Sequence, residues 1–178
     1  MPSTAIGESD IFDLFSKQWA LVSAGRLDDF NACTVSWGSM GTLWRRPGTN
    51  GAVITIYLHP SRLTCEYMQK HQHFTVSFFP HAFRRSLQIM GSLSGRDANK
   101  TALAGLSPMT LDDSVGFEEA TIEFTCRKLY QHQFSKADIA EDVQAYYENN
   151  PGAYPVDENG AWQPHWMFIG EVESVLRR

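Results

Sequence analysis

The sequence predicts a mainly β fold with peripheral helices (α+β), in which about six antiparallel strands close into a small barrel. Three observations predict this class. Several short runs alternate apolar and polar residues with a period of two, helical spacing is confined to short segments between those runs, and 43% of the 178 residues are hydrophobic against 20% charged. Because a chain of this length and composition is expected to bury one core, we treat residues 1–178 as a single domain.

The predicted strands follow from the alternation. Over residues 52–58 every even position is apolar, and over residues 74–78 large apolar side chains alternate with Thr75 and Ser77. The expected strands cover residues 19–24, 32–43, 52–58, 74–79, 121–127 and 167–176.

Short helices are expected between the strands. Ser61, which follows Pro60, is placed to cap the first helix, and Asp97 is placed to cap another that Gly105 ends. The expected helices cover residues 61–72, 84–90, 97–105 and 137–147, and a loop rich in Asn, Pro and Gly follows over residues 149–164.

Composition excludes several classes of partner. The net charge is −5 and no run of Lys and Arg exceeds two residues, so we expect no nucleic-acid partner. No stretch approaches the ~20 apolar residues that span a bilayer, and the N-terminus lacks a leader pattern, so we expect no membrane partner and a cytoplasmic location. The three cysteines form no C-x-x-C pair and are expected to be small buried hydrophobes, and no metal site is expected.

Four polar segments stand out against the apolar strands. Residues 31–39 read Asn-Ala-Cys-Thr-Val-Ser-Trp-Gly-Ser, which places hydroxyls, an amide and an indole on an extended run without a charge. Residues 60–64 (Pro-Ser-Arg-Leu-Thr), 74–80 (Phe-Thr-Val-Ser-Phe-Phe-Pro) and 94–100, which include Ser-Gly-Arg-Asp and a lysine, complete the pattern. Uncharged donors and acceptors suit a flat polar ring, whereas a helix N-terminus with a nearby cation suits a phosphate.

These segments together resemble the flavin reductase and flavoredoxin family, whose members hold FMN in a split β-barrel. The resemblance extends from about residue 19 to residue 176 in both the order and the spacing of segments. It implies a six-stranded antiparallel Greek-key split β-barrel of the FMN-binding type, FMN bound without a covalent bond, and a homodimer.

The phosphate and the ring of FMN call for different residues. Ser61, Arg62 and Thr64 lie on the predicted first turn of a helix, where the resemblance assigns them to the phosphate together with Lys100. The resemblance also implies that the ring and ribityl chain lie beside residues of the first polar segment, which are Asn31, Thr34, Val35, Ser36 and Trp37. In an extended run Thr34 and Ser36 share one face, whereas Val35 and Trp37 share the other.

Two further groups are assigned by the resemblance. Ser77, Phe78 and Phe79 are expected to line the same cleft, and His165 is expected to face the site as a catalytic proton donor or a nicotinamide contact. Each also has a structural explanation, because Phe78 and Phe79 suit a core and His165 suits a loop with a structural hydrogen bond.

One departure from the family pattern concerns the phosphate. His59 stands before Pro60 where the family usually carries arginine, so phosphate binding is expected to weaken as pH rises.

The resulting function is a flavoprotein oxidoreductase that passes electrons from NAD(P)H through bound FMN to a flavin or another acceptor. No Gly-x-Gly-x-x-Gly follows a predicted strand, so a nicotinamide is expected to lie across the flavin itself. Two alternatives stay open. One is a flavoredoxin-type electron carrier that has no NAD(P)H activity and takes electrons from a protein partner, and the other is a small-molecule binding barrel that has lost the cofactor.

Overall fold

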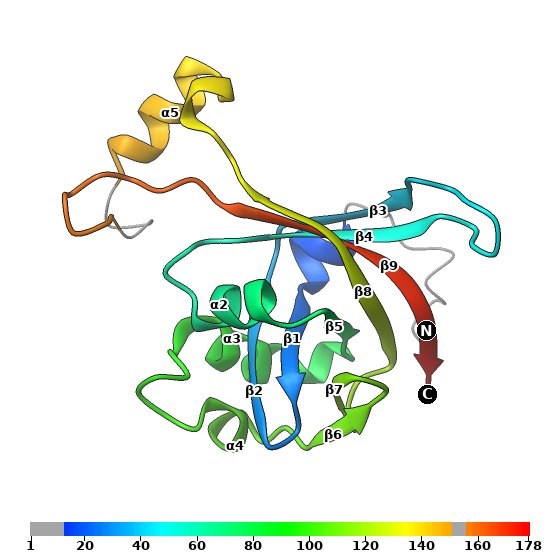
Figure 1. The fold of residues 1–178 in the computed structure, drawn as a ribbon. Coiled ribbons are helices and arrows are strands. Elements are labelled where there is room, and N and C mark those ends of the chain that lie inside the picture. Colours follow the sequence, from blue (N-terminus) through cyan, green and yellow to red (C-terminus); the bar gives the residue numbers. More distant parts are fainter. Residues whose placement is uncertain (1–12, 151–155) are drawn as a thin grey trace.

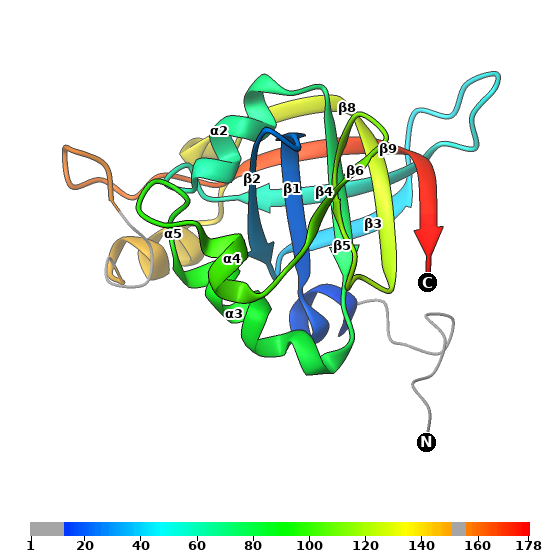
Figure 2. The same cartoon turned by 90° about the horizontal axis from the view of Figure 1, so that it is seen from below.

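The computed structural model describes residues 13–150 and 156–178, and its centre is one strongly curved antiparallel sheet (Figures 1 and 2). Its strands are β1 (Ala20–Arg26), β2 (Asp29–Val35), β3 (Gly38–Thr42), β4 (Ala52–Leu58), β5 (His73–Phe78), β8 (Ile122–Gln133) and β9 (Trp166–Arg177). These seven strands lie in the order β2-β1-β5-β8-β9-β4-β3, and a separate hairpin is formed by β6 (Pro108–Leu111) and β7 (Ser114–Phe117).

The mainly β class with peripheral helices is confirmed, but the predicted number of six strands is wrong. The single strand expected over residues 32–43 is two strands, because the chain leaves the ladder at Ser36 and Trp37. The sheet is also not closed. Its two edges are β2 and β3, and they are joined only by this two-residue link, so the edge of β2 stays open for a ligand or a covering element.

The core follows the period-two alternation. In β4 the side chains of Ile54 and Ile56 are buried inside the curved sheet, where they meet Phe74, Val76 and Phe168 from other strands. Register shifts in β8, between Thr125 and Cys126 and between Lys128 and Tyr130, interrupt its ladder with β9. Such bulges bend a strand, as the curvature of a barrel-like sheet requires.

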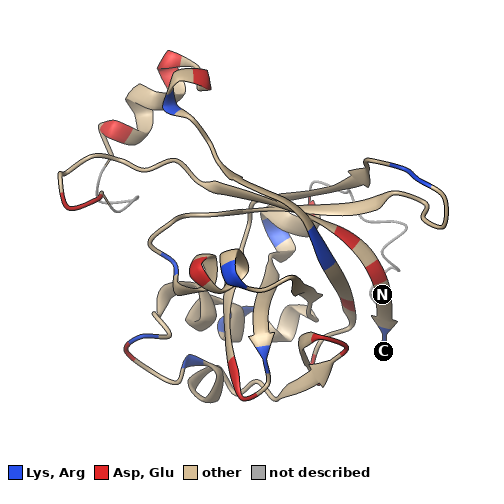
Figure 3. Cartoon of the chain, viewed as in Figure 1, with Lys and Arg blue, Asp and Glu red and all other residues tan. Residues whose placement is uncertain are grey.

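Helices pack against both faces of the sheet. They are α2 (Leu63–Lys70), α3 (Arg84–Ser92), α4 (Lys100–Ala104) and α5 (Glu141–Glu148), with short helical turns at Leu14–Gln18, His81–Phe83 and Lys136–Asp138. A second apolar cluster, which includes Leu21, Leu87, Met90 and Phe117, packs α3 against the sheet. Helix α5 lies on an arm between β8 and β9 that carries several acidic residues (Figures 1 and 3), and its Tyr147 ring contacts Trp37 with centroids 6.2 Å apart.

Two predicted helix caps are wrong. Helix α2 begins at Leu63 with Arg62 at its cap position, and no side chain caps it, because the Ser61 hydroxyl pairs with the His59 ring instead. Helix α4 begins at Lys100, and the Asn99 side chain accepts a hydrogen bond from the Ala102 amide. Its end at Gly105, which has a φ of 65°, is confirmed.

The corrected cap predicts a stability difference between two neighbouring substitutions. Asn99→Ala removes the acceptor for the Ala102 amide and is expected to lower the free energy of unfolding by ~1 kcal/mol, whereas Asp97→Ala serves as the matched control and is expected to cost much less. Urea denaturation of both variants measures this. Equal losses, or a larger loss for Asp97→Ala, would contradict the assignment of Asn99 as the cap.

The three cysteines are buried and free, as expected of small apolar side chains, and burial raises the pKa of each thiol. Within residues 13–150 and 156–178 no helix is both long and apolar enough to cross a membrane, and no three side chains from His, Cys, Asp and Glu gather as metal ligands.

Candidate functional site

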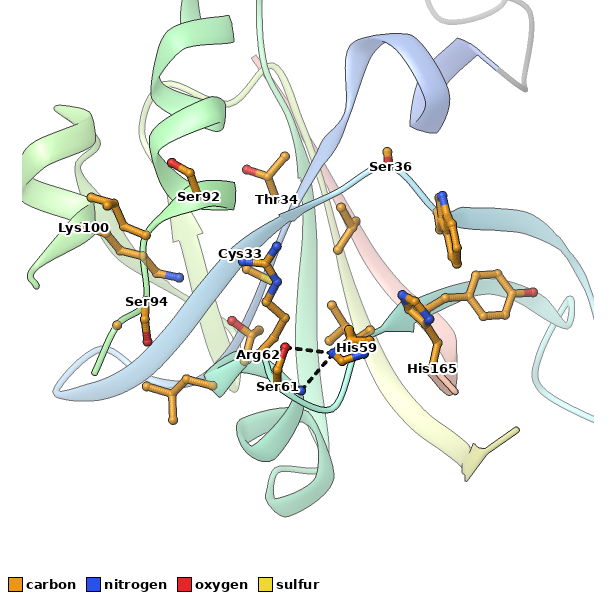
Figure 4. A pocket seen from close by; sticks show the side chains of 18 residues that line it. Cys33, Thr34, Ser36, His59, Ser61, Arg62, Ser92, Ser94, Lys100 and His165 are labelled. Atoms are coloured by element: carbon orange, nitrogen blue, oxygen red, sulfur yellow. Dashed lines mark hydrogen bonds between the residues drawn. The ribbon is translucent and has the colours of Figure 1, made fainter. Parts of the chain in front are cut away.

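A cavity of about 380 Å³ opens beside the edge strand β2, and we call it the cation pocket. Five parts of the chain build it: the end of β2 and the link after it, the end of β4, the first turn of α2, the loop between α3 and α4 with the start of α4, and the residue before β9 (Figure 4). Its walls are Cys33, Thr34, Val35, Ser36, Trp37, Tyr57, Leu58, His59, Ser61, Arg62, Leu63, Thr64, Ser92, Leu93, Ser94, Gly95, Lys100 and His165.

Most of the residues predicted from the sequence meet in this pocket. They come from distant parts of the chain, and they are Thr34, Val35, Ser36, Trp37, Ser61, Arg62, Thr64, Lys100 and His165. Lys100 and Ser94 lie at one end and His165 at the other, with Arg62 between them (Figure 4). The pocket therefore has a cationic end and an aromatic end.

Asn31 lies behind the wall and not in it. Its side-chain oxygen accepts a hydrogen bond from the Thr64 hydroxyl at 2.7 Å, which ties β2 to the first turn of α2. A Cβ at Gly95 would lie 2.1 Å from the Asn31 amide nitrogen, so only glycine lets the loop after α3 approach this closely. Asn31 thus holds three walls of the pocket in place.

Ser77, Phe78 and Phe79 are not brought to the pocket. The Ser77 hydroxyl donates to the buried Glu123 carboxylate at 2.9 Å, and Arg178 pairs with the same carboxylate at 3.0 Å. Phe78 packs against Phe15 with ring centroids 5.6 Å apart, and Phe79 belongs to the cluster under α3. The physical reason is that β5 is a central strand with both faces covered, one by the core cluster that contains Phe78 and the other by β7.

Among residues 13–150 and 156–178, no acidic side chain pairs with the cationic end of the pocket. The Lys100 side chain is 5% exposed, and its ammonium has the Met90 carbonyl oxygen at 3.5 Å. Burial, together with the nearby Arg62, lowers its pKa. None of the described residues that line the pocket carries a carboxylate. A cation buried without a counter-ion is costly, so this end of the pocket favours an anion.

Arg62 and the hydroxyls complete that end. One guanidinium nitrogen of Arg62 donates to the Gly91 carbonyl at 2.7 Å, which fixes the side chain and leaves its other donors for a ligand. Ser92 and Ser94 line the same wall. Helix N-terminal amides near a cation and hydroxyls form an arrangement suited to a phosphate.

Arg96 has a different role from the one its motif suggested. Arg96 belongs to the polar segment at residues 94–100, but it does not line the pocket: it forms an ion pair with Glu66 and donates to the Ser61 carbonyl at 3.3 Å. It therefore fastens the loop after α3 to the start of α2 from outside the pocket.

His59 is a neutral wall residue at neutral pH. Its Nδ1 accepts a hydrogen bond from the Ser61 amide at 3.2 Å and lies 2.8 Å from the Ser61 hydroxyl. Burial, and then the charge of Arg62, lowers its pKa below 6.5. Any loss of phosphate affinity that accompanies deprotonation of His59 is therefore expected at a lower pH than for an ordinary histidine.

The aromatic end is a stack of rings. His165 lies against Trp37 with ring centroids 4.5 Å apart, and its ring also contacts that of His59 at 5.3 Å. The His165 carbonyl accepts from the Phe134 amide at 3.0 Å, which continues the β8–β9 ladder and fixes the position of the residue. Burial lowers the pKa of His165 to about 4, so at neutral pH it presents a neutral imidazole.

The Thr34 hydroxyl has a structural hydrogen bond. Its hydroxyl donates to the Leu87 carbonyl at 2.5 Å, which links β2 to α3. Ser36 lies just beyond the end of β2, at the point where the ladder stops. The remaining backbone and hydroxyl groups here suit an uncharged polar ring edge.

Some wall residues were missed from the sequence. They are Cys33, Tyr57, Leu58, Leu63, Ser92 and Leu93. Tyr57 and Leu58 could have been identified from the sequence, because they end a predicted strand just before the polar segment that begins at residue 60. Ser92 and Leu93 carried no pattern of their own, and they reach the pocket only because α3 ends beside β2.

Comparison with known proteins agrees with this architecture. A family model described as a flavin reductase like domain matches residues 12–178, and no curated protein matches the chain. A flavoredoxin from Methanosarcina acetivorans superposes with a TM-score of 0.64 at 16% identity over 90% of this chain and 68% of that chain. An FMN-binding protein from Thermus thermophilus superposes with a TM-score of 0.66 at 17% identity, over 100% of this chain and 82% of that chain. A flavoredoxin of Desulfovibrio vulgaris (Miyazaki F) superposes with a TM-score of 0.64 at 17% identity, over 99% of this chain and 76% of that chain. At these identities the solved structures show the fold alone.

Proposed function

This chain belongs to the flavin reductase-like domain family, and we propose that it is an oxidoreductase. We propose that its cation pocket binds FMN without a covalent bond. The observation that carries the proposal is the composition of the pocket. Two cations and several hydroxyls line it. Among the described residues, no carboxylate lines it and none pairs with the buried Lys100. The neighbours named as FMN-binding proteins and flavoredoxins support the same cofactor.

We assign the residues of the pocket to different parts of FMN. Arg62, Lys100 and Ser61 hold the phosphate, because they combine charge with hydroxyl and helix N-terminal donors. Ser36, Trp37 and His165 lie at the other end, where neutral donors and flat rings suit the flavin ring. FMN, when bound, supplies the redox chemistry, and the protein supplies position and electrostatics.

Neutral groups at the ring end have a consequence for the chemistry. At neutral pH neither His59 nor His165 is charged, so any proton that His165 gives comes from a neutral N–H group. We therefore propose that His165 positions the flavin ring and a nicotinamide. Its neutral imidazole is a weaker proton donor than the imidazolium that the sequence pattern suggested.

The electron source is tested by rapid mixing. We propose that NADH or NADPH reduces the FMN-loaded protein, and stopped-flow mixing with each nucleotide is expected to bleach the visible flavin band. Absence of bleaching in a protein that binds FMN would favour the electron carrier that takes electrons from a protein partner. A purified protein that is colourless and takes up no added FMN would refute the cofactor and favour a small-molecule binding barrel.

Assembly and location remain predictions from the sequence. We propose that two copies of the chain form a homodimer in the cytoplasm, as the family resemblance implies. Light scattering on the purified protein checks the dimer, since the mass of a single chain is 20.1 kDa.

A further inference from the structure

A second cavity, of about 620 Å³, lies directly beyond the aromatic end of the cation pocket. The two cavities share Ser36, Trp37 and Tyr57, so a molecule in one would be separated from a molecule in the other only by these side chains. We call the second cavity the aromatic pocket, because Phe15, Trp37, Tyr57 and Phe134 form most of its wall together with Met40.

The walls of the aromatic pocket are held in place by the fold. Tyr57 and Phe134 are stacked with ring centroids 5.8 Å apart and planes 26° apart. A Cβ at Gly38 would lie 2.5 Å from the Phe15 ring, so the missing side chain at this position is what lets Phe15 seat against β3. The cavity is therefore largely preformed, which is typical of small-molecule sites.

The chemistry of this wall differs from that of the cation pocket. None of its described lining residues is Lys, Arg, Asp or Glu, and its polar groups are serine hydroxyls, the Tyr57 hydroxyl, the Trp37 indole N–H and the backbone. Flat rings around an uncharged space favour a flat uncharged ligand by burial of apolar surface and ring stacking. The phosphates of a pyridine nucleotide would find no cation here.

We infer that the aromatic pocket binds an uncharged aromatic molecule of one or two fused rings, beside the ligand of the cation pocket. The cavity volume lies within the usual range for such sites, roughly 300–1,000 Å³. The role of this molecule as the second substrate rests on the proposed function. The binding of the molecule does not rest on it, because no residue of the cationic end lines the aromatic pocket.

The test uses menadione, an uncharged two-ring quinone, in calorimetric titrations of the full chain with and without saturating FMN. The wild-type protein is expected to bind one menadione per chain. Phe134→Asp places a charge in the wall and is expected to weaken that binding by at least about tenfold. It should leave FMN affinity unchanged, because Phe134 does not line the cation pocket.

Tyr130→Asp is the matched control. Tyr130 and Phe134 are each 39% exposed, but Tyr130 lies outside both pockets, so this variant is expected to bind menadione as the wild type does. Equal menadione affinity in the two variants would overturn the inference. A wild-type protein that binds FMN but no menadione would also overturn it. If, in addition, the Phe134→Asp substitution lowered the molecular mass in solution from dimer to monomer, the result would show that a second copy of the chain covers the cavity. Menadione binding with the expected Phe134 dependence in a protein that takes no FMN would support this site and refute the proposed function.

Discussion

Lys100→Met is expected to weaken FMN binding by roughly 1.5 to 3 kcal/mol, the range for hydrogen bonds to charged groups, without destabilising the apoprotein. Lys100 is buried and has no acidic partner among the described residues, so in the absence of a ligand its charge is a cost to the folded state. Methionine keeps the length and most of the volume of the side chain. The apoprotein is therefore expected to be as stable as the wild type, or more stable by about 1 kcal/mol.

The opposite signs of the two effects separate a ligand-binding cation from a structural one. FMN affinity is measured by quenching of flavin fluorescence, and stability by urea denaturation of the apoprotein. Arg62→Ala is the companion variant, and it is expected to lose a similar amount of affinity because it removes the second charge of the same end. An Lys100→Met protein that keeps wild-type FMN affinity would refute the phosphate assignment, and one that loses stability as well would show a structural role.

The strands with strict alternation were predictable from the sequence. Residues 52–58 and 74–78 form β4 and β5 with nearly the expected bounds, because the alternation of apolar side chains reflects burial directly. The division between β2 and β3 was not predictable in this way, since Ser36 and Trp37 continue the alternation and contain no Pro or Gly to mark a break. The β6–β7 hairpin was missed because its strands have only four residues each.

The candidate site was predictable in its segments but not in every residue. Polar residues beside a strand end, such as Thr34, Ser36 and Arg62, do meet in one pocket. Ser77 has the same residue type in the same kind of pattern, yet it lies in the core with Glu123. Period-two alternation shows which side chains share a face of a strand, but it does not show that a central strand is covered on both faces.

The electrostatics of the site could not be read from residue types alone. A histidine has an ordinary pKa near neutrality, and the sequence suggested His59 as a source of pH-dependent affinity and His165 as a proton donor. In the folded chain the burial of both rings and the charge of Arg62 lower both pKa values. Arg62 is only three residues from His59, but its approach to His165 and the burial of both rings depend on tertiary packing.

The stability of the protein is expected to fall as pH decreases from about 6.5 to about 4, with His165 as the main contributor. The folded state keeps this imidazole neutral down to a pKa of about 4, whereas its ordinary value is 6.5. Between these values the unfolded chain binds a proton that the folded chain does not, so acidification favours unfolding. The difference corresponds to about 3 kcal/mol, fully present above the upper value and lost below the lower one.

Other groups either add to this change or act at a different pH. His59 shifts in the same direction and adds to the same loss. Glu171 acts at lower pH, because hydrogen bonds from Thr49, Arg127 and Arg46 hold its pKa at about 2, and its contribution is lost only as pH falls from about 4.5 toward that value. The change above pH 4.5 therefore reports the two histidines.

His165→Phe isolates the contribution of one ring. Phenylalanine keeps a flat ring against Trp37 but cannot take up a proton, so the slope of unfolding free energy between pH 6.5 and 4.5 is expected to flatten and to retain only the part due to His59. Urea denaturation at each pH measures it, and an unchanged dependence on urea concentration verifies that both proteins unfold to comparable states. A variant with the same slope as the wild type would show that the imidazole of His165 takes up its proton as readily in the folded chain as in the unfolded one, and that its position against Trp37 does not keep water from it.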